Sequence, residues 1–316
     1  MNQNAYSEFA QLLKTSLEQS STRGLFFSTV LKNNDTMYDT VSIKDVPLAP
    51  IAYLQEYFSE YENGHSIAEI TDEILLLLNA PSNQLETEIP NLASYHTISP
   101  KILPALVNLN LNQERLKNIP YSVFLDLAVT YKIYLEPTDG VTGNIEINNN
   151  MMSLWSITLE QIHTTAMENL KNLEFSYYST AELFAQMIKE KEELPPDIDN
   201  ITLSDIGLVV LSSECAYSNG AIVLLSPDTF RKALDKYFPT ADALLILPCS
   251  THEVLVLPYP ETSSSIPYFI EMLRSANQSG SIAPEEILND ENIYKYTKET
   301  NLIEIVKEQE EEYEEI

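Results

Sequence analysis

Short apolar runs come in pairs along this chain, and each pair is followed by a segment with helical periodicity. Two strand-like runs and one helix recur near residues 24–62, 123–170, 205–238 and 242–277. The recurrence is one of secondary-structure type, because no residue pattern repeats with it. Strands joined by short turns pair antiparallel, and the helix that follows packs on a face of the sheet. We therefore predict an α+β fold of antiparallel sheets built from repeated strand-strand-helix units, with helices packed on the sheet faces.

The first 80 residues contain three helical patterns and one hairpin pattern. The predicted elements are a helix over 4–20, a hairpin over 24–43, and helices over 47–64 and 66–78. The polar stretch "KNND" at 32–35 supplies the turn of the hairpin. Pro50 lies near the start of the second helix. Ser66 followed by Glu69 forms an S-x-x-E capping box, which predicts where the third helix begins.

The rest of the chain predicts strand pairs with helices between them. The predicted strands cover about 98–109, 121–137, 144–149, 205–213, 221–226, 242–248 and 253–259, and a last small hairpin covers 293–306. The predicted helices cover about 112–120, 149–172, 180–193, 227–238, 265–277 and 284–288. Thr158 and Gln161 predict a capping box within the second of these helices.

A change of composition near residues 80–95 suggests a domain boundary. This stretch, "APSNQLETEIPNLASY", has two prolines and much polarity, as boundaries often do. We predict an N-terminal α+β domain over 1–80, a linker over 81–95 and a C-terminal α+β domain over 96–306. The acidic tail over 307–316 holds six glutamates in ten residues, so we expect it to be solvated.

Acidic residues greatly outnumber basic ones, 47 against 18, which gives a formal net charge of −29. Such an excess repels nucleic-acid phosphates and anionic lipid, and it attracts basic proteins or cations. Direct nucleic-acid binding is not expected, because the basic residues are scattered and form no platform with aromatic side chains. Two interpretations stay open: solubility alone, or a mimic of nucleic-acid phosphates that occupies a basic groove of another protein.

Glycine and cysteine usage excludes several classes of protein. The seven glycines are too scattered for a phosphate-binding loop, which counts against P-loop and Rossmann nucleotide sites. Cys215 and Cys249 make no disulfide framework. The N-terminus lacks a basic start followed by an apolar stretch, and the longest apolar runs are far short of a membrane span. We expect a soluble protein of the bacterial cytoplasm, without a cofactor and without membrane contact.

The stretch "ILPCSTHEVLVLP" at 246–258 holds the most reactive residue types of the chain. The candidate catalytic residues are Cys249, Ser250, His252 and Glu253. A nucleophile needs a base within hydrogen-bond reach, and the base needs an orienting group. Cys249 and His252 can face each other across a tight turn, but Glu253 alternates to the other side once a strand begins. The alternative is a hairpin turn whose polar side chains satisfy its own backbone groups.

Metal binding and acid–base chemistry find little support. The turn supplies two zinc ligands where a structural zinc site needs four. Cys215 and His163 could be recruited, but no spacing demands it, so we expect no metal site and a structural role for His163. Asp126 interrupts the apolar strand "VFLDLAV". It lies either on the solvent face or buried with a partner such as Arg115 or a backbone amide.

Two groups of residues are candidates for contact with a partner protein. Tyr53, Tyr57 and Tyr61 fall on an i, i+4, i+8 row of a predicted helix, which is typical of a core face or a docking face. The tail contributes a second group, whose charge would attract a basic partner. The tail candidates are Glu310, Glu311 and Glu312.

Five segments carry a resemblance when they are taken in order. They are "YFSEYENGHSIAEI" at 57–70, "VNLNLNQERLKNIPYSVFLDLAVTY" at 107–131, "WSITLEQIHTTAMENL" at 155–170, "LPCSTHEVLVLP" at 247–258 and "IAPEEILNDENIYKY" at 282–296. Over about residues 57–300 the chain resembles an uncharacterised bacterial family, domain of unknown function 5688. The family usually has a serine where Cys249 stands here, which weakens a thiol mechanism. The resemblance implies no reaction, cofactor or substrate, and it suggests a protein carried by mobile elements.

Three hypotheses for function follow. The leading one is a non-enzymatic, acidic binding protein that acts by contact with another protein, with an inhibitor of a basic nucleic-acid groove as its refinement. The first alternative is a hydrolase or thiol enzyme that uses the Cys249, His252 and Glu253 turn. It requires a pocket at the turn and a lowered thiol pKa. The second alternative is a structural subunit that docks through an exposed tyrosine row.

Overall fold

The computed structural model describes residues 3–46, 50–79, 92–138, 141–180, 182, 207–213 and 219–306. The chain divides into two compact units, Met1–Ile98 and Ser99–Ile316. Both units combine helices with antiparallel sheets, so the predicted α+β class is confirmed. Of the predicted linker, residues 81–91 lie outside the described part. The predicted tail over 307–316 also lies outside it.

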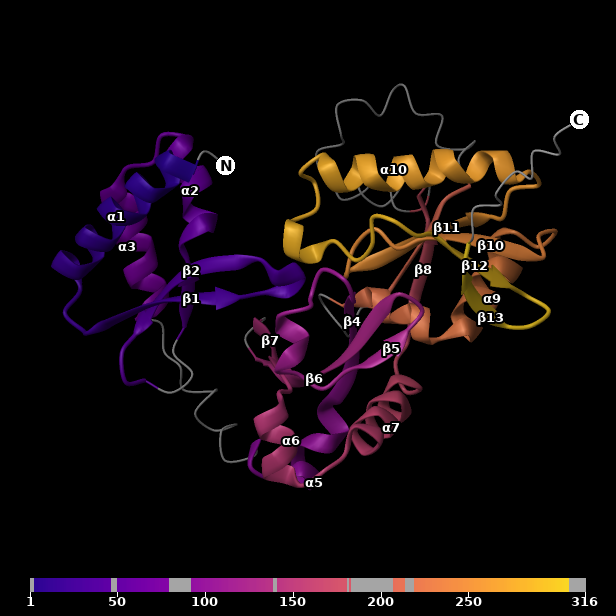
Figure 1. Ribbon diagram of the computed structural model, residues 1–316, viewed down its shortest axis with the longest axis horizontal. Coiled ribbons are helices and arrows are strands. Elements are labelled where there is room, and N and C mark those ends of the chain that lie inside the picture. The colour runs from indigo at the N-terminus through magenta and orange to yellow at the C-terminus, as the bar shows by residue number, and fades with distance from the viewer. Residues whose placement is uncertain are drawn as a thin grey trace, which may run out of the picture. The chain divides into compact units, whose positions relative to one another are not determined.

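The first unit packs helices on one face of a three-stranded antiparallel sheet (Figure 1). Its elements are α1 (Gln3–Ser20), β1 (Leu25–Leu31), η1 (Asn33–Asp35), β2 (Met37–Ile43), β3 (Ile51–Tyr53), α2 (Leu54–Glu62), α3 (Ile67–Leu78) and α5 (Tyr95–Ile98). The strand order is β1-β2-β3. The short 3-10 turn η1 closes the hairpin where the sequence predicts its turn.

Helical spacing of apolar side chains builds the core of the first unit. Phe9, Leu13 and Leu17 follow one another at four-residue intervals on α1, and all three are fully buried. Ile70 and Ile74 of α3 are equally buried in the same cluster. The covered face of the sheet contributes Val41, Ile43 and Ala52. Burial of each large aliphatic or aromatic side chain stabilises the fold by roughly 1.5–3 kcal/mol.

One boundary in the first unit differs from the sequence prediction. The helix predicted over 47–64 begins only at Leu54, because the residues before it pair with β2 as a third strand. In that pairing Ile51 lies opposite Ser42, and Tyr53 lies opposite Thr40. The capping box at Ser66 and Glu69 is confirmed, with both of its hydrogen bonds formed.

The second unit contains two antiparallel sheets. Its strands are β4 (Ile102–Asn108), β5 (Ser122–Phe124), β6 (Leu127–Thr138), β7 (Val141–Glu146), β8 (Ser176–Ser179), β9 (Val209–Ser212), β10 (Ala243–Leu247), β11 (Glu253–Pro258), β12 (Tyr294–Thr297) and β13 (Leu302–Ile305). The larger sheet has the order β13-β12-β10-β11-β9-β8. In the smaller sheet β6 lies beside β4, while β5 and β7 pair with successive parts of β6.

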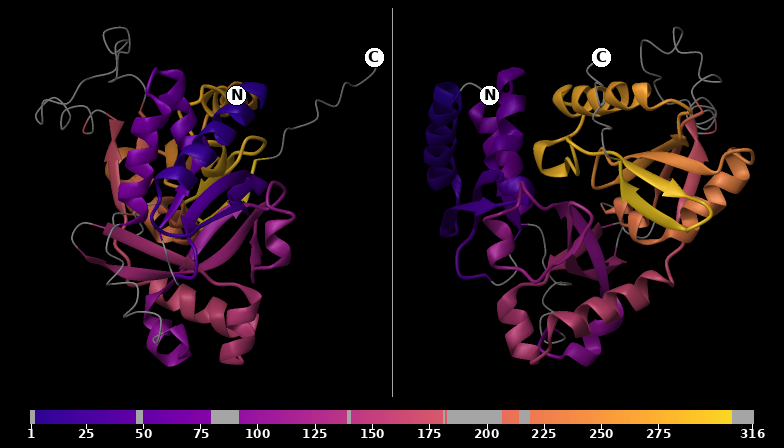
Figure 2. Two further views of the ribbon diagram at one scale, coloured as in Figure 1. Left: turned by 90° about the vertical axis from the view of Figure 1, so that its left-hand side faces the viewer. Right: turned by 45° about the vertical axis from the view of Figure 1, so that its right-hand side comes forward.

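Helices and 3-10 turns surround these sheets. They are η2 (Ser99–Lys101), η3 (Arg115–Lys117), α6 (Asn149–Trp155), α7 (Leu159–Leu170), η5 (Gly220–Leu225), α9 (Pro227–Tyr237), η6 (Ser263–Ser265), α10 (Ile266–Gln278) and η7 (Pro284–Glu286). Figures 1 and 2 show α10 along one face of the larger sheet. It packs there on Leu245 and Leu247 of β10. On the opposite face, Phe230 of α9 stacks with Tyr296, the strand partner of Leu244.

The smaller sheet is covered on both faces. All seven residues of β4 are buried, which requires material on each side of the strand. α7 packs against β4 and β6, and η5 contacts β4 as well. Several polar side chains of this sheet are partly or fully withdrawn from water, and they form much of the site described below.

Several predicted elements of the second unit differ from the structure, and one lies largely outside it. The strand predicted over 121–137 is the antiparallel pair of β5 and β6, and the helix predicted over 112–120 contains only the 3-10 turn η3. The predicted strand over 221–226 is the 3-10 helix η5, so the strand-strand-helix unit near 205–238 does not form as predicted. Most residues of η5 are buried, and a short apolar run of that kind can be a strand or a buried helix. The helix predicted over 149–172 is broken at Ser156, which has a left-handed φ of 55°. The helix predicted over 180–193 lies largely outside the described residues.

Other predictions for the second unit are confirmed. The Thr158 and Gln161 capping box forms at the start of α7. The last predicted hairpin is the β12–β13 pair. None of the helices in the described ranges is both long enough and apolar enough to cross a lipid bilayer.

Candidate functional site

The turn between β10 and β11 holds itself together with its own polar groups. The Ser250 Oγ accepts hydrogen bonds from the backbone N–H of His252 at 3.1 Å and from that of Glu253 at 3.3 Å. The backbone N–H of Thr251 donates to the Glu286 carbonyl at 2.8 Å. Ser250 is therefore a turn-closing residue, as in the structural alternative that the sequence left open.

The Cys249 thiol is not in a reactive environment. Its Sγ donates to the Leu247 carbonyl at 3.6 Å, and the side chain packs against the core under α10. Burial, with a smaller contribution from the Glu253 carboxylate, raises the pKa of the Cys249 thiol to about 12. The thiol enzyme hypothesis requires the opposite shift and a thiol–imidazole contact, and Sγ forms no such bond with His252 among the described residues.

The imidazole of this turn has a partner that the sequence analysis did not assign to it. The Nε2 of His252 lies 3.0 Å from Oε1 of Glu286, and both side chains are partly exposed. Glu253, the predicted orienting acid, instead begins β11. Glu286 lies 34 positions further along the chain in η7, so no local spacing in the sequence could assign it. Cys249, His252 and Glu253 therefore do not form a catalytic line.

A glycine fixes the position of this turn against η5. A Cβ added at Gly220 would lie 1.9 Å from the His252 carbonyl and 2.2 Å from the Ser212 Oγ. The Ser212 Oγ donates to the same His252 carbonyl at 2.8 Å. The backbone N–H of Ala221 donates to the Thr251 carbonyl at 3.1 Å. Only glycine allows the two segments to approach so closely.

Next to Gly220 lies a desolvated lysine. The Nζ of Lys132 on β6 is 3.4 Å from Oδ1 of Asn219, which is itself buried, and Asn219 donates to the Tyr134 hydroxyl. Burial lowers the pKa of Lys132; the Glu146 carboxylate opposes this shift, and the Arg115 guanidinium adds to it. Burial raises the pKa of Tyr134 to about 12, although the Asn219 hydrogen bond lowers it.

The cross-strand neighbour of Lys132 is already paired with another cation. Glu146 lies opposite Lys132 in the sheet register, and its carboxylate forms an ion pair with Arg115. From the sequence, Arg115 was a possible partner of Asp126. In the structure the ion pair of Arg115 is with Glu146 instead. Lys132 is left with an amide oxygen as its nearest polar contact, which makes it an energetically costly group. No local pattern indicates this, because a lysine in an alternating strand normally faces water.

Asp126 is partly buried and has partners of its own. One of its oxygens accepts from the Tyr294 hydroxyl at 2.6 Å, and the other accepts from the Asn289 and Asn292 side-chain amides at 2.7 and 2.8 Å. The prediction that Asp126 is either exposed or partnered is thus resolved in favour of partners. They come from a segment more than 160 positions away, and they connect the smaller sheet to the larger one.

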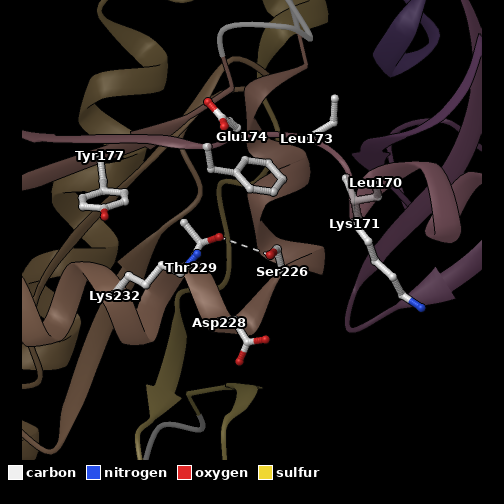
Figure 3. A pocket seen from close by; sticks show the side chains of 10 residues that line it. Leu170, Lys171, Leu173, Glu174, Tyr177, Ser226, Asp228, Thr229 and Lys232 are labelled. Carbon is white, nitrogen blue, oxygen red and sulfur yellow. Dashed lines mark hydrogen bonds between the residues drawn. The ribbon is translucent and has the colours of Figure 1, made fainter.

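A pocket in this unit lies beside the first turn of α9 and has a volume of about 460 Å³. Figure 3 shows the Ser226 and Thr229 hydroxyls facing each other at its centre, 3.1 Å apart, between Tyr177 and Lys171. Its charged lining residues are Lys171, Glu174, Asp228 and Lys232. The two signs are balanced, so the pocket does not select a charged ligand. A second, smaller pocket contains His163.

The tyrosine row is not an exposed docking face. Tyr57 is buried in the core of the first unit, and Tyr61 packs against the same core. Tyr53 belongs to β3, where the Lys32 ammonium lies 3.4 Å from its ring centroid. The core interpretation therefore holds for Tyr57 and Tyr61, whereas Tyr53 lies outside that core cluster. The tail candidates Glu310, Glu311 and Glu312 lie outside the described residues, as does Cys215.

A family model described as a family of unknown function, DUF5688, matches residues 6–298. The chain belongs to DUF5688. Searches of curated proteins and of solved structures both found no match. The family assignment adds no reaction to the geometry, so the function of this DUF5688 protein has to be argued from its residues.

Four of the five segments that resemble the family lie in the second unit of this DUF5688 protein, and they contact one another there. Segment 107–131 contacts segment 282–296 through the hydrogen bond between Asp126 and Tyr294. The same segment contacts 155–170 through the hydrogen bond between Tyr131 and His163. Segment 247–258 contacts 282–296 through the pair of His252 and Glu286. The family match itself covers most of both units.

Proposed function

We propose that this DUF5688 protein is a non-enzymatic, acidic binding protein that acts by contact with a basic surface of another protein. The observation that carries the proposal is its net charge of −29. A field of this size steers association with positively charged partners and disfavours anionic ones. We place the protein in the cytoplasm of bacteria that carry mobile elements.

Ion pairs within the chain support the proposal. Because basic side chains that are already paired do not neutralise further carboxylates, the excess negative charge can attract a partner. Arg115, Lys117, Lys236 and Lys298 form ion pairs with carboxylates of the same chain. Lys14 and Lys295 lie over aromatic rings. Several of the few basic side chains are thus already used within the fold.

The outer face of α3 is the surface that we favour for this contact. Asp72 and Glu73 are exposed there, one turn before Leu76, whose side chain is 77% exposed. No basic residue occurs anywhere in α2 or α3. Carboxylates beside an exposed leucine fit a partner surface that combines lysine or arginine with an apolar side chain.

The test is a measurement of affinity against salt concentration. Partners are captured from a lysate of the host, and their dissociation constants are measured by interferometry from about 50 to about 500 mM NaCl. We expect the affinity to fall steeply with salt. Polyglutamate of matched charge is the competitor that distinguishes a specific surface from charge alone. An affinity that stays flat over this range contradicts the proposal.

The refinement, an inhibitor of a nucleic-acid groove, has its own readout. A captured partner that binds DNA or RNA should release its nucleic acid when this protein is added. Asp72→Lys combined with Glu73→Lys should weaken that competition by about tenfold or more. The matched control is the same charge reversal at Glu299 and Glu304 in the second unit. Equal losses for both pairs would assign the effect to net charge and not to α3.

A further inference from the structure

A small pocket in the second unit combines an apolar wall with one polar end. Its volume is about 230 Å³, below the range of about 300–1,000 Å³ typical of drug-sized ligands. The apolar lining residues are Val123, Phe124, Val129, Met167, Leu224, Leu225 and Pro227. The polar lining residues are Ser122 of β5 and His163 of α7. An apolar cavity with a few converging polar groups is the usual form of a small-molecule site.

Three polar groups meet beside this pocket, two of them from its lining residues Ser122 and His163. The Nδ1 of His163 lies 3.0 Å from the Tyr131 hydroxyl and 3.2 Å from the Ser122 hydroxyl. The two hydroxyls are 3.2 Å apart. Tyr131 is fully buried, so its proton needs an acceptor within this group of three. The Nδ1 lone pair is the nearer of the two acceptors.

This arrangement sets the state of the imidazole ring. When Nδ1 accepts from a hydroxyl, the neutral ring carries its proton on Nε2. In the described part of the chain, no protein acceptor is hydrogen-bonded to that nitrogen. The ring therefore offers an unused N–H donor in a residue that lines an apolar pocket.

We infer that this pocket binds a small, mainly apolar molecule with a single carbonyl oxygen, which accepts a hydrogen bond from Nε2 of His163. The apolar wall accounts for the hydrocarbon part of the ligand, and the donor selects the oxygen. A neutral ligand is favoured over a carboxylate, because the net charge of −29 repels anions.

The geometry supports binding and not acyl transfer. A serine nucleophile needs an imidazole whose second nitrogen is oriented by a carboxylate. Here Nδ1 is shared between Ser122 and the Tyr131 hydroxyl, and no carboxylate is bonded to the His163 ring among the described residues. Ser122 and Tyr131 are positioning residues that fix the tautomer of the imidazole.

The test uses two probes of nearly the same shape. Acetophenone carries the carbonyl oxygen, and α-methylstyrene replaces that oxygen with a methylene group. Binding is followed in the full chain by the labelled methyl signal of Met167, with Met272 of α10 as the distant reference. We expect saturable shifts at Met167 only, and an affinity for acetophenone about fivefold or more above that for α-methylstyrene.

Variants then assign the preference to the imidazole. His163→Leu should make the affinities for the two probes equal, whereas Ser122→Ala should keep the preference, because Tyr131 still donates to Nδ1. Nitrogen NMR of the unliganded protein should show the His163 proton on Nε2. Equal affinities in the unmodified protein, shifts at Met272 instead of Met167, or a proton on Nδ1 would each overturn the inference. The comparison of probes in the unmodified protein decides the matter even if His163→Leu does not fold.

Discussion

A single carboxylate, Asp126, connects the two sheets of the second unit. It accepts three hydrogen bonds. Two come from Asn289 and Asn292 in the segment that leads into β12, and the third comes from Tyr294 of β12 itself. Asp126→Asn replaces one acceptor oxygen with a donor that faces these groups. We expect the free energy of unfolding in urea to fall by roughly 2–4 kcal/mol. Glu299→Gln, an exposed change in the same unit, is the control. A loss below about 0.5 kcal/mol would contradict this role.

For Lys132 we expect the opposite effect, a gain in stability when its charge is removed. Its ammonium group lies beside the side-chain amide of Asn219 and not beside a free carboxylate. Lys132→Met keeps the length of the side chain and removes the charge. We expect the variant to be more stable by roughly 1–2 kcal/mol near neutral pH. Since burial lowers the pKa of Lys132 below the unfolded value of about 10.4, this advantage should shrink as the pH rises through the lowered folded pKa, and it should be lost by about pH 10.4.

The control for Lys132→Met is Lys171→Met, which changes an exposed lysine. Urea unfolding of both variants is measured across the same pH series. Destabilisation by Lys132→Met at neutral pH would show that the ammonium group contributes favourably where it lies.

Cys249 supplies a chemical prediction at the same scale. Its thiol has a pKa of about 12 because it is buried, so almost none of it is thiolate at neutral pH. In a Cys215→Ser background, iodoacetamide should modify the folded protein at least about 100-fold more slowly than the urea-unfolded chain. Mass spectrometry of quenched samples measures both rates. Equal rates would restore the thiol enzyme hypothesis.

Among the elements, η5 depends most on one residue. A Cβ at Gly220 would overlap the His252 carbonyl and the Ser212 hydroxyl, and backbone groups cannot move aside cheaply. Gly220→Ala should therefore cost more than about 4 kcal/mol or prevent folding. Gly143→Ala is the matched control, since its Cβ would meet only a Leu135 methyl group at 3.5 Å. Circular dichroism and urea titration of the two variants decide this.

Local patterns predicted the elements whose cause is local. The capping boxes at Ser66 and Thr158 and the helical spacing of Phe9, Leu13 and Leu17 depend on residues within a few positions. β3 and η5 were missed because their conformations are decided elsewhere. β3 exists because β2 offers a partner edge, and η5 exists because the β10–β11 turn packs onto Gly220. Tertiary contacts outweigh propensity in both cases.

The candidate site could be predicted only in part, for the same reason. The sequence supplied Cys249 and His252 as neighbours, and it singled out Asp126 as a carboxylate in an apolar strand. It could not bring Glu286 to His252, Tyr294 to Asp126, or Tyr131 and Ser122 to His163, because these contacts depend on the pairing and packing of two sheets. The net charge, in contrast, can be counted from the sequence without knowledge of the fold.

The whole molecule should be sensitive to alkaline conditions, since burial raises the pKa of tyrosines in both units. The affected tyrosines are Tyr6, Tyr57, Tyr131, Tyr134 and Tyr294. A raised folded pKa favours the folded state fully below the unfolded value of about 10, and this stability is lost as the pH rises through the folded value. We expect the free energy of unfolding to fall between about pH 10 and pH 12.

Tyr134→Phe tests this dependence, because it removes a group whose pKa is raised to about 12. The alkaline fall should become smaller in the variant by on the order of 2–3 kcal/mol. Tyr268→Phe, at a side chain that is 68% exposed, should leave the fall unchanged. Urea unfolding at a series of pH values measures all three proteins. Curves of the same slope in all of them would show that alkaline unfolding does not arise from Tyr134, and a fall that begins well below the ordinary tyrosine pKa would exclude these tyrosines altogether.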